Sequence, residues 1–110
     1  MQAVLYTPEQ VHLDIRVKAK KGRIDEVILH AYNTIALSHK EEGCLEYKLF
    51  HSEDDILLKG TWKNNMALDM HLLLKYHLDL VETLLPPLSK KIKIKVYKEI
   101  EPPITALSIG

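Results

Sequence analysis

The sequence predicts an α+β fold of order β-α-β-β-α-β, the ferredoxin-like arrangement in which an antiparallel four-stranded sheet carries two helices on one face. Three observations predict it. Apolar and polar residues alternate in four segments of strand length, two other segments show helical spacing, and turn residues separate them. A chain of 110 residues, 46% of them hydrophobic, has the size of one domain. We expect residues 1–110 to form that domain, with a core at about 11–97 and a C-terminal tail at about 101–110.

The first strand and the first helix are predicted in the N-terminal part of the chain. From Val11 to Ala19 every second residue is apolar, so these side chains share one face of a strand. After a turn at Lys20-Lys21-Gly22, apolar residues at helical spacing extend from Ile24 to Ile35. We expect Gly43 to end this helix, because glycine adopts the left-handed conformation at low cost.

Two strands follow, and a polar connection at residues 52–55 separates them. The first has Leu45, Tyr47 and Leu49 on one side. The other reads from Ile56 to Trp62, and its parity places Trp62 on the same face as its core residues.

The second helix is predicted as one continuous run that ends at Pro86-Pro87. Its apolar face is expected to contain Met66, Met70, Leu73, His77, Val81 and Leu84. A fourth strand follows, in which Ile92, Ile94 and Val96 alternate with lysines.

Composition argues against several classes of protein. Fifteen basic and fifteen acidic residues give a net charge of zero, which predicts no nucleic-acid or anionic-membrane partner. The single cysteine, Cys44, cannot form an internal disulfide, and no apolar run approaches membrane-spanning length, so we expect a cytoplasmic protein. The sequence contains no glycine-rich nucleotide motif and no metal-ligand cluster, which predicts chemistry without a cofactor or a metal.

Three stretches resemble one known family. They are the segment Glu41 to Tyr47, then Trp62, and the segment Ala67 to Leu72, which are similar to the antibiotic biosynthesis monooxygenase family and in particular to its small quinol monooxygenase-like members. The similarity covers about residues 11–97. It implies a cofactor-independent monooxygenase that acts on a quinol or polyphenol-type aromatic with O₂. It also implies a homodimer whose two sheets face each other as an α/β barrel, with a pocket between helices and sheet in each subunit.

The chain departs from such relatives at several positions. They commonly carry a Glu where this chain has Gly60, an Asn where it has Leu58 and a Tyr where it has Leu68. Two alternatives to the oxygenase therefore stay open. One is an isomerase of the same fold that acts on a small hydroxy-ketone metabolite, and the other is a non-catalytic dimer that binds a small hydrophobic ligand.

The resemblance and the chemistry of the side chains single out five residues. Trp62 offers an aromatic face for a planar substrate, and His71 is the candidate acid or base, because imidazole titrates near neutral pH. These two are the predicted catalytic residues. Tyr76, Asn33 and His51 are predicted to contact substrate with them.

Two other residues near the family motif have simpler interpretations. We expect Glu41 and Glu42, where the first helix should end, to form a salt bridge across the sheet or the dimer, with a pocket carboxylate as the alternative. We expect Cys44 to be a small buried residue and not a nucleophile, because the sequence places no base beside it.

Overall fold

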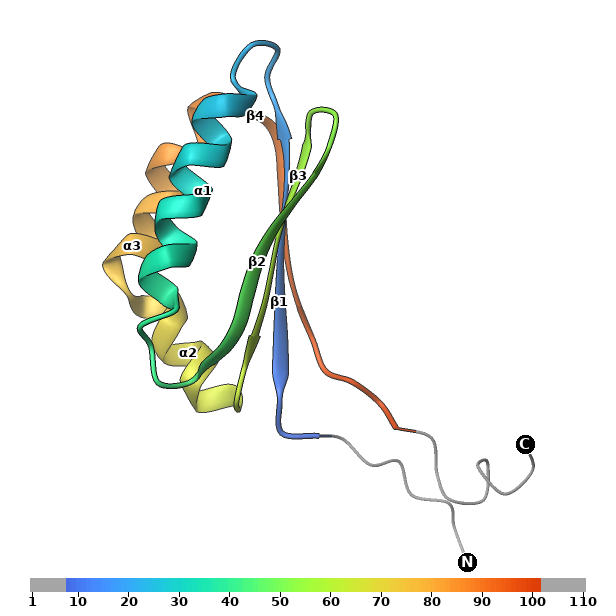
Figure 1. Ribbon diagram of the computed structural model, residues 1–110, viewed down its shortest axis with the longest axis vertical. Helices are drawn as coiled ribbons and strands as arrows, with labels where there is room; N and C mark the ends of the chain where they lie inside the picture. Colours follow the sequence, from blue (N-terminus) through green and yellow to red (C-terminus); the bar gives the residue numbers. More distant parts are fainter. Residues whose placement is uncertain (1–7, 102–110) are drawn as a thin grey trace, which may run out of the picture.

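One antiparallel four-stranded sheet forms the framework of the protein (Figure 1). The computed structural model describes residues 8–101, so the predicted tail lies outside the described residues except for Glu101. The strands are β1 (Val11–Ala19), β2 (Cys44–Ser52), β3 (Asp55–Trp62) and β4 (Ser89–Tyr97), in the order β2-β3-β1-β4. The predicted ferredoxin-like class is confirmed.

The helices lie together on one face of this sheet and leave the other face open (Figure 1). In chain order they are α1 (Ile24–Ser38), α2 (Asn65–Leu73), α3 (Lys75–Leu78), the π-helical η1 (Asp79–Leu84) and the 3-10 helix η2 (Pro86–Leu88). Within residues 8–101, no helix has both the length and the apolar character needed to cross a membrane.

The core lies between the helices and the central strands. The alternation in β1 is confirmed, because all five of its apolar side chains are at most 1% exposed. They pack with Ile56, Leu58 and Trp62 of β3 and with Val27 and Leu80 of the helical layer. Each large apolar side chain buried in this way contributes about 1.5–3 kcal/mol to folding.

The second helical region differs from the prediction of one continuous helix. At Leu74 the backbone is extended (φ −70°, ψ 142°), which ends α2 before α3 begins. The predicted apolar face is wrong in its first half, since Met66, Met70 and Leu73 are 71%, 64% and 77% exposed. A helical period holds only while the helix continues, and the break at Leu74 separates the spacing of α2 from that of the later turns. The residues buried in this region, of which His77 was predicted for the apolar face, are Leu68, His71, His77, Leu80, Leu85 and Leu88.

Gly43 does not end the first helix as predicted. Helix α1 stops at Ser38, and within residues 8–101 the glycine with positive φ is Gly22. Gly43 is needed for a close contact, because a Cβ atom placed on it would lie 2.4 Å from the Cβ of Ala67. The absence of a side chain at this position therefore lets α2 approach the connection between α1 and β2.

The start of β2 also departs from simple alternation. A register shift between Cys44 and Glu46 leaves Leu45 without a partner opposite it on β3. Leu45 is 51% exposed, whereas Tyr47 is 2% exposed. The prediction that Leu45 shares the buried face is thus wrong, because a bulge residue interrupts the period of two.

The contact between Gly43 and Ala67 predicts a specific mutational coupling. Gly43→Ala should lower the free energy of unfolding by about 1–3 kcal/mol through overpacking. In the double variant with Ala67→Gly, part of that loss should return, although glycine in a helix itself costs about 1 kcal/mol. Chemical denaturation of the two single variants and the double variant measures the coupling. If the two losses simply add, this contact does not set the position of α2.

Candidate functional site

The carboxylate of Glu41 joins three side chains from different parts of the fold. Glu41 lies in the connection between α1 and β2. Its Oε1 accepts a hydrogen bond from the indole Nε1–H of Trp62 at 3.1 Å. Its Oε2 lies 2.8 Å from Nδ1 of His71 and accepts a hydrogen bond from the hydroxyl of Tyr76. Residues from the end of β3, from α2 and from α3 therefore converge on one acidic group.

Charge states in this cluster follow from burial and hydrogen bonding. Burial alone would raise the pKa of Glu41, but the hydrogen bonds from Tyr76, His71 and Trp62 outweigh it and hold this pKa below its ordinary value. Burial lowers the pKa of His71 despite the nearby carboxylate. Burial and the hydrogen bond to Glu41 raise the pKa of Tyr76. At neutral pH the cluster thus contains a carboxylate, a neutral imidazole and a protonated phenol.

The ionised state of Glu41 determines the tautomer of His71. An ionised carboxylate can only accept hydrogen bonds, so Nδ1 of His71 must carry the proton that it donates to Glu41. The other ring nitrogen, Nε2, then has a free lone pair. It is buried and has no hydrogen-bond partner among the described residues. The geometry provides an oriented imidazole whose second nitrogen can accept a proton.

A second buried imidazole lies beside the first. The ring centroids of His71 and His77 are 4.8 Å apart, and Nδ1 of His77 is also buried without a partner in the described part of the chain. The hydroxyl of Tyr47 is a third such atom, and its ring centroid lies 6.0 Å from that of His71. Burial lowers the pKa of His77 to about 4, and the neighbouring His71 acts in the same direction. Both histidines are neutral bases at neutral pH.

Gly60 allows the aromatic side chains to occupy their positions. A Cβ atom at this residue would lie 2.6 Å from Cζ3 of Trp62 and 2.9 Å from Cδ1 of Tyr47. The two rings pack edge to face, with their centroids 5.2 Å apart, over the strand at this point. A side chain such as Glu at residue 60 would displace both rings. The carboxylate of this site comes instead from Glu41.

A groove of about 520 Å³ opens beside the cluster. It lies between the α1–β2 connection and α2, and it is lined by Glu41, Glu42, Gly43, Lys63, Asn64, Met66, Ala67, Met70, His71 and Leu74. Trp62 is fully buried and is not among the lining residues. A ligand in this groove would lie against Glu41, with the fully buried rings of His71 and Trp62 behind it.

The structure brings together three of the five predicted site residues. Trp62 and His71 have ring centroids 4.4 Å apart, and Tyr76 shares Glu41 with them. Asn33 is exposed on α1, and His51 is exposed near the hairpin end of β2. Because Trp62 pairs with Cys44 at the opposite end of that strand pair, His51 is remote from the cluster.

Glu41 was not among the five predicted site residues. A salt bridge was expected for it, with a pocket carboxylate as the alternative, and its partners are a neutral imidazole, an indole and a phenol. The segment that resembles the family begins at Glu41, and this was the feature of the sequence that could have identified it as a site residue.

Burial, with Glu41 as a second cause, raises the pKa of Cys44 to about 11, so this thiol is protonated at neutral pH. Among the described residues, no group of three or more His, Cys, Asp or Glu could hold a metal ion.

Comparisons with known proteins define the class. The sequence model of the family described as antibiotic biosynthesis monooxygenase matches residues 10–83, and the chain belongs to this family. An uncharacterized protein of Synechocystis sp. is 32% identical over 88 residues, which are 77% of this chain and 60% of that protein. The chain thus matches only about three fifths of the length of this curated relative.

Solved structures share the fold. A protein from Shewanella oneidensis has a TM-score of 0.82 at 17% identity, covering 88% of this chain and 98% of that one. A protein of unknown function from Bacteroides thetaiotaomicron, described as a possible oxidoreductase, has a TM-score of 0.71 at 25% identity, covering 84% and 98%. A mutant of SnoaB from Streptomyces nogalater, described as a cofactor-independent oxygenase, has a TM-score of 0.71 at 16% identity, covering 81% and 91%.

Buried neutral histidines predict a loss of stability on mild acidification. The pKa of His77 is about 4 in the folded protein and near 6.5 in the unfolded chain. Between these values the unfolded state binds the proton and the folded state does not. Stability should therefore fall as pH decreases from 6.5 to 4, with a slope of up to about 1.4 kcal/mol per pH unit from this residue.

Urea denaturation across this pH range measures the slope. His77→Gln should flatten it, whereas His51→Gln, at an exposed histidine, should leave it unchanged. The lowered pKa of His71 adds to the effect in the same direction, and that of Glu41 adds to it below about pH 4.5. A His77→Gln variant with the wild-type slope would show that His77 is not held neutral by burial.

Proposed function

We propose that this protein is a cofactor-independent monooxygenase that oxidises a quinol or polyphenol-type aromatic with O₂. Family membership and the similarity in fold to a cofactor-independent oxygenase support the reaction type. The observation that carries the proposal is the orientation of His71, whose Nδ1–H is held by Glu41 and whose Nε2 is free to act as a base. We propose the groove beside Glu41 as the route by which substrate approaches.

The proposed reaction requires only substrate and O₂. Nε2 of His71 removes a proton from a phenol or an activated C–H of the substrate, and the electron-rich anion transfers an electron to O₂. The two radicals combine, and the resulting peroxide loses water to give a quinone. One oxygen atom enters the product, the other leaves as water, and the substrate supplies all the electrons. The role of the protein is to remove the proton and to exclude bulk water from the radical pair.

Glu41 is the positioning residue in this scheme. Its hydrogen bond to Nδ1 fixes the ring orientation and the tautomer, and its negative charge stabilises the imidazolium that forms when Nε2 takes the proton. Tyr76 and Trp62 hold the carboxylate in turn by donating to it. Three donors on one carboxylate leave it little freedom to turn away from His71.

One observation favours a rival function. Trp62 and His71 are both 0% exposed, so a substrate reaches them only when the wall of the groove moves. A non-catalytic domain that binds a hydrophobic ligand in the groove, against Met66 and Met70, needs no such movement.

The isomerase alternative uses the same base as the oxygenase, because proton transfer between adjacent carbons also requires a positioned imidazole.

Oxygen uptake with a panel of quinols and naphthols tests the proposed function. His71→Gln should lower the turnover rate by about 10²–10⁴-fold, the usual contribution of a general base. Glu41→Gln should lower it less, by about 10–100-fold, and should shift the pH profile, because the neutral amide no longer stabilises the imidazolium. His51→Gln is the matched control and should keep the wild-type rate.

Three outcomes would contradict the oxygenase. No uptake above background with any member of the panel would exclude this substrate class. Solvent deuterium incorporated into a hydroxy-ketone without O₂ uptake would establish the isomerase. Thermal stabilisation by an aromatic ligand that survives His71→Ala, with no turnover, would establish the binding domain.

We also propose that the chain forms a homodimer through the open sheet faces and that residues 1–110 act as one domain. Phe50 and Tyr97 are 48% and 42% exposed, although large aromatic side chains are usually covered. Asp14 on the same face is only 5% exposed, and its one close cation is Lys59, whose Nζ lies 3.6 Å from Oδ1 without a hydrogen bond. We place this dimer in a reducing compartment, in keeping with a single free cysteine.

Sedimentation at several protein concentrations should therefore give a mass of twice 12.7 kDa. Tyr97→Asp should shift the equilibrium toward the monomer by placing a charge in the interface. Tyr32→Asp, at an exposed tyrosine of α1 on the helical layer, is the control and should not change the mass. A monomer at all concentrations would exclude the dimer.

A further inference from the structure

Helix α2, one wall of the groove beside Glu41, is held in place by few side chains. It lies at one end of the helical layer, beside the α1–β2 connection (Figure 1). Of its nine residues, Leu68 and His71 are buried, whereas Met66, Met70 and Leu73 are exposed. Isolated helices shorter than about 12–15 residues are marginal in water, so a helix of this length has little stability of its own. The position of α2 therefore depends on a small number of contacts.

Extended residues stand at both ends of α2. Asn64 precedes the helix with φ −163° and ψ 176°, and Leu74 follows it with φ −70° and ψ 142°. Hinges are residues at the ends of elements, where a change in φ and ψ moves the whole element. The side chain of Asn64 accepts a hydrogen bond from the amide of Ala67 at 2.8 Å, which keeps the first turn intact. Helix α2 thus has the form of a rigid segment between two pivots.

The opposite wall of the groove, the α1–β2 connection, is fixed by its backbone. The amide of Glu41 donates to the carbonyl of Ser38 at 3.0 Å, and the carbonyl of Glu41 accepts from the amide of Cys44 at 3.2 Å. The amide of Lys63, which follows β3, donates to the carbonyl of Gly43 at 2.9 Å. Glu41 therefore keeps its place when α2 moves.

His71 joins the two walls. Within residues 8–101, one side-chain hydrogen bond connects α2 to the α1–β2 connection, and it runs from Nδ1 of His71 to Oε2 of Glu41. The ring of His71 also covers that of Trp62, because their centroids are 4.4 Å apart. Rings at this distance are in contact, so no planar molecule enters between them while α2 stays in place. Movement of α2 away from Glu41 breaks the hydrogen bond and uncovers Trp62.

We propose that α2 is a hinged lid, with the hydrogen bond between His71 and Glu41 as its latch, and that it opens to admit substrate to Trp62. This inference rests on the proposed function, which requires a substrate to reach the buried rings. Substrate enters along Met66 and Met70 while the lid is open, and closure returns His71 to Glu41. The base is thus oriented when the lid is closed, and closure excludes bulk water at the same time.

Quenching of Trp62 fluorescence by acrylamide tests the lid, because Trp62 is the single tryptophan of the chain and is fully buried. Leu74→Gly frees one pivot and should raise the quenching constant by roughly threefold, in keeping with the greater backbone freedom of glycine. Leu29→Gly, at an exposed leucine inside α1, is the matched control. It weakens the fold as a whole and should leave the quenching of Trp62 unchanged.

Native-state amide hydrogen exchange follows the lid directly. Amides of α2 should exchange through local opening, at rates that low concentrations of urea leave unchanged, whereas amides of α1 should exchange through global unfolding and accelerate. Glu41→Gln should speed exchange in α2 by roughly fivefold, because a neutral amide accepts a weaker hydrogen bond from His71 than a carboxylate does. Leu29→Gly should speed exchange in α1 and leave that of α2 unchanged, since α1 stays folded in both states of the lid.

Two results would overturn the lid. One is exchange of the α2 amides only through global unfolding, with the urea dependence seen in α1. The other is equal quenching of Trp62 in the wild type and in Leu74→Gly. Oxygen uptake together with either result would remove the lid and leave the oxygenase. Local opening of α2 without oxygen uptake would remove the oxygenase and leave the lid as the entrance for the isomerase alternative, which uses the same base.

Discussion

The acidic group of Glu41 is the interaction on which the site depends. The indole of Trp62, the imidazole of His71 and the phenol of Tyr76 all donate a hydrogen bond to it. Each donor comes from a different element, so the carboxylate joins β3, α2 and α3 to the connection after α1. An ionised group with little exposure is expensive to bury, and three hydrogen bonds compensate that cost. The orientation of His71 follows directly from this arrangement.

Close packing around the carboxylate explains two glycines and a break in the helix. Gly43 lets α2 approach the α1–β2 connection, which places His71 within reach of Glu41. Gly60 leaves room for Trp62 and Tyr47 to lie over β3. The extended backbone at Leu74 ends α2 and starts a new helix, which allows two parts of the same region to face the cluster. Relatives commonly carry a Glu where this chain has Gly60. In this chain a different carboxylate, that of Glu41, contacts Trp62 and His71.

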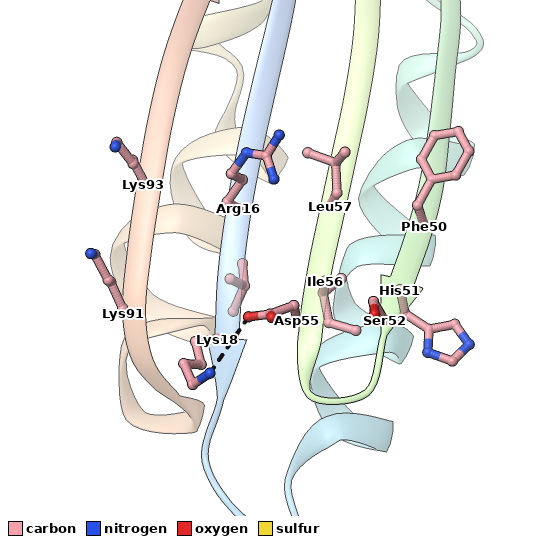
Figure 2. Close-up of a pocket in the computed structure, with 11 residues that line it drawn as sticks. Arg16, Lys18, Phe50, His51, Ser52, Asp55, Ile56, Leu57, Lys91 and Lys93 are labelled. Atoms are coloured by element: carbon pink, nitrogen blue, oxygen red, sulfur yellow. Dashed lines mark ion pairs between the residues drawn. The ribbon is translucent and has the colours of Figure 1, made fainter.

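The two faces of the sheet have different physical characters. The helical side is apolar, and its buried polar groups gather around Glu41. The open side carries charged side chains, and Arg16, Lys18, Lys91 and Lys93 lie on neighbouring strands near one end of it (Figure 2). Burial controls protonation on the first side, whereas on the second side neighbouring charges shift the pKa of Lys93 and of Glu46.

The alternation of apolar and polar residues was sufficient to predict the strands, the class of fold and the orientation of Trp62. Alternation depends only on residues that are neighbours in the chain. Family resemblance directed attention to His71, yet sequence spacing could not show that its partner is Glu41, thirty residues away. The exposed face of α2 and the bulge at Leu45 were predicted wrongly, and the separation of His51 from the cluster could not be predicted, for the same reason. They depend on where a helix breaks, where a strand gains a residue and which segments meet in space. Only tertiary packing decides these, since the free energy of a buried hydrogen bond depends on groups that the chain brings together by folding.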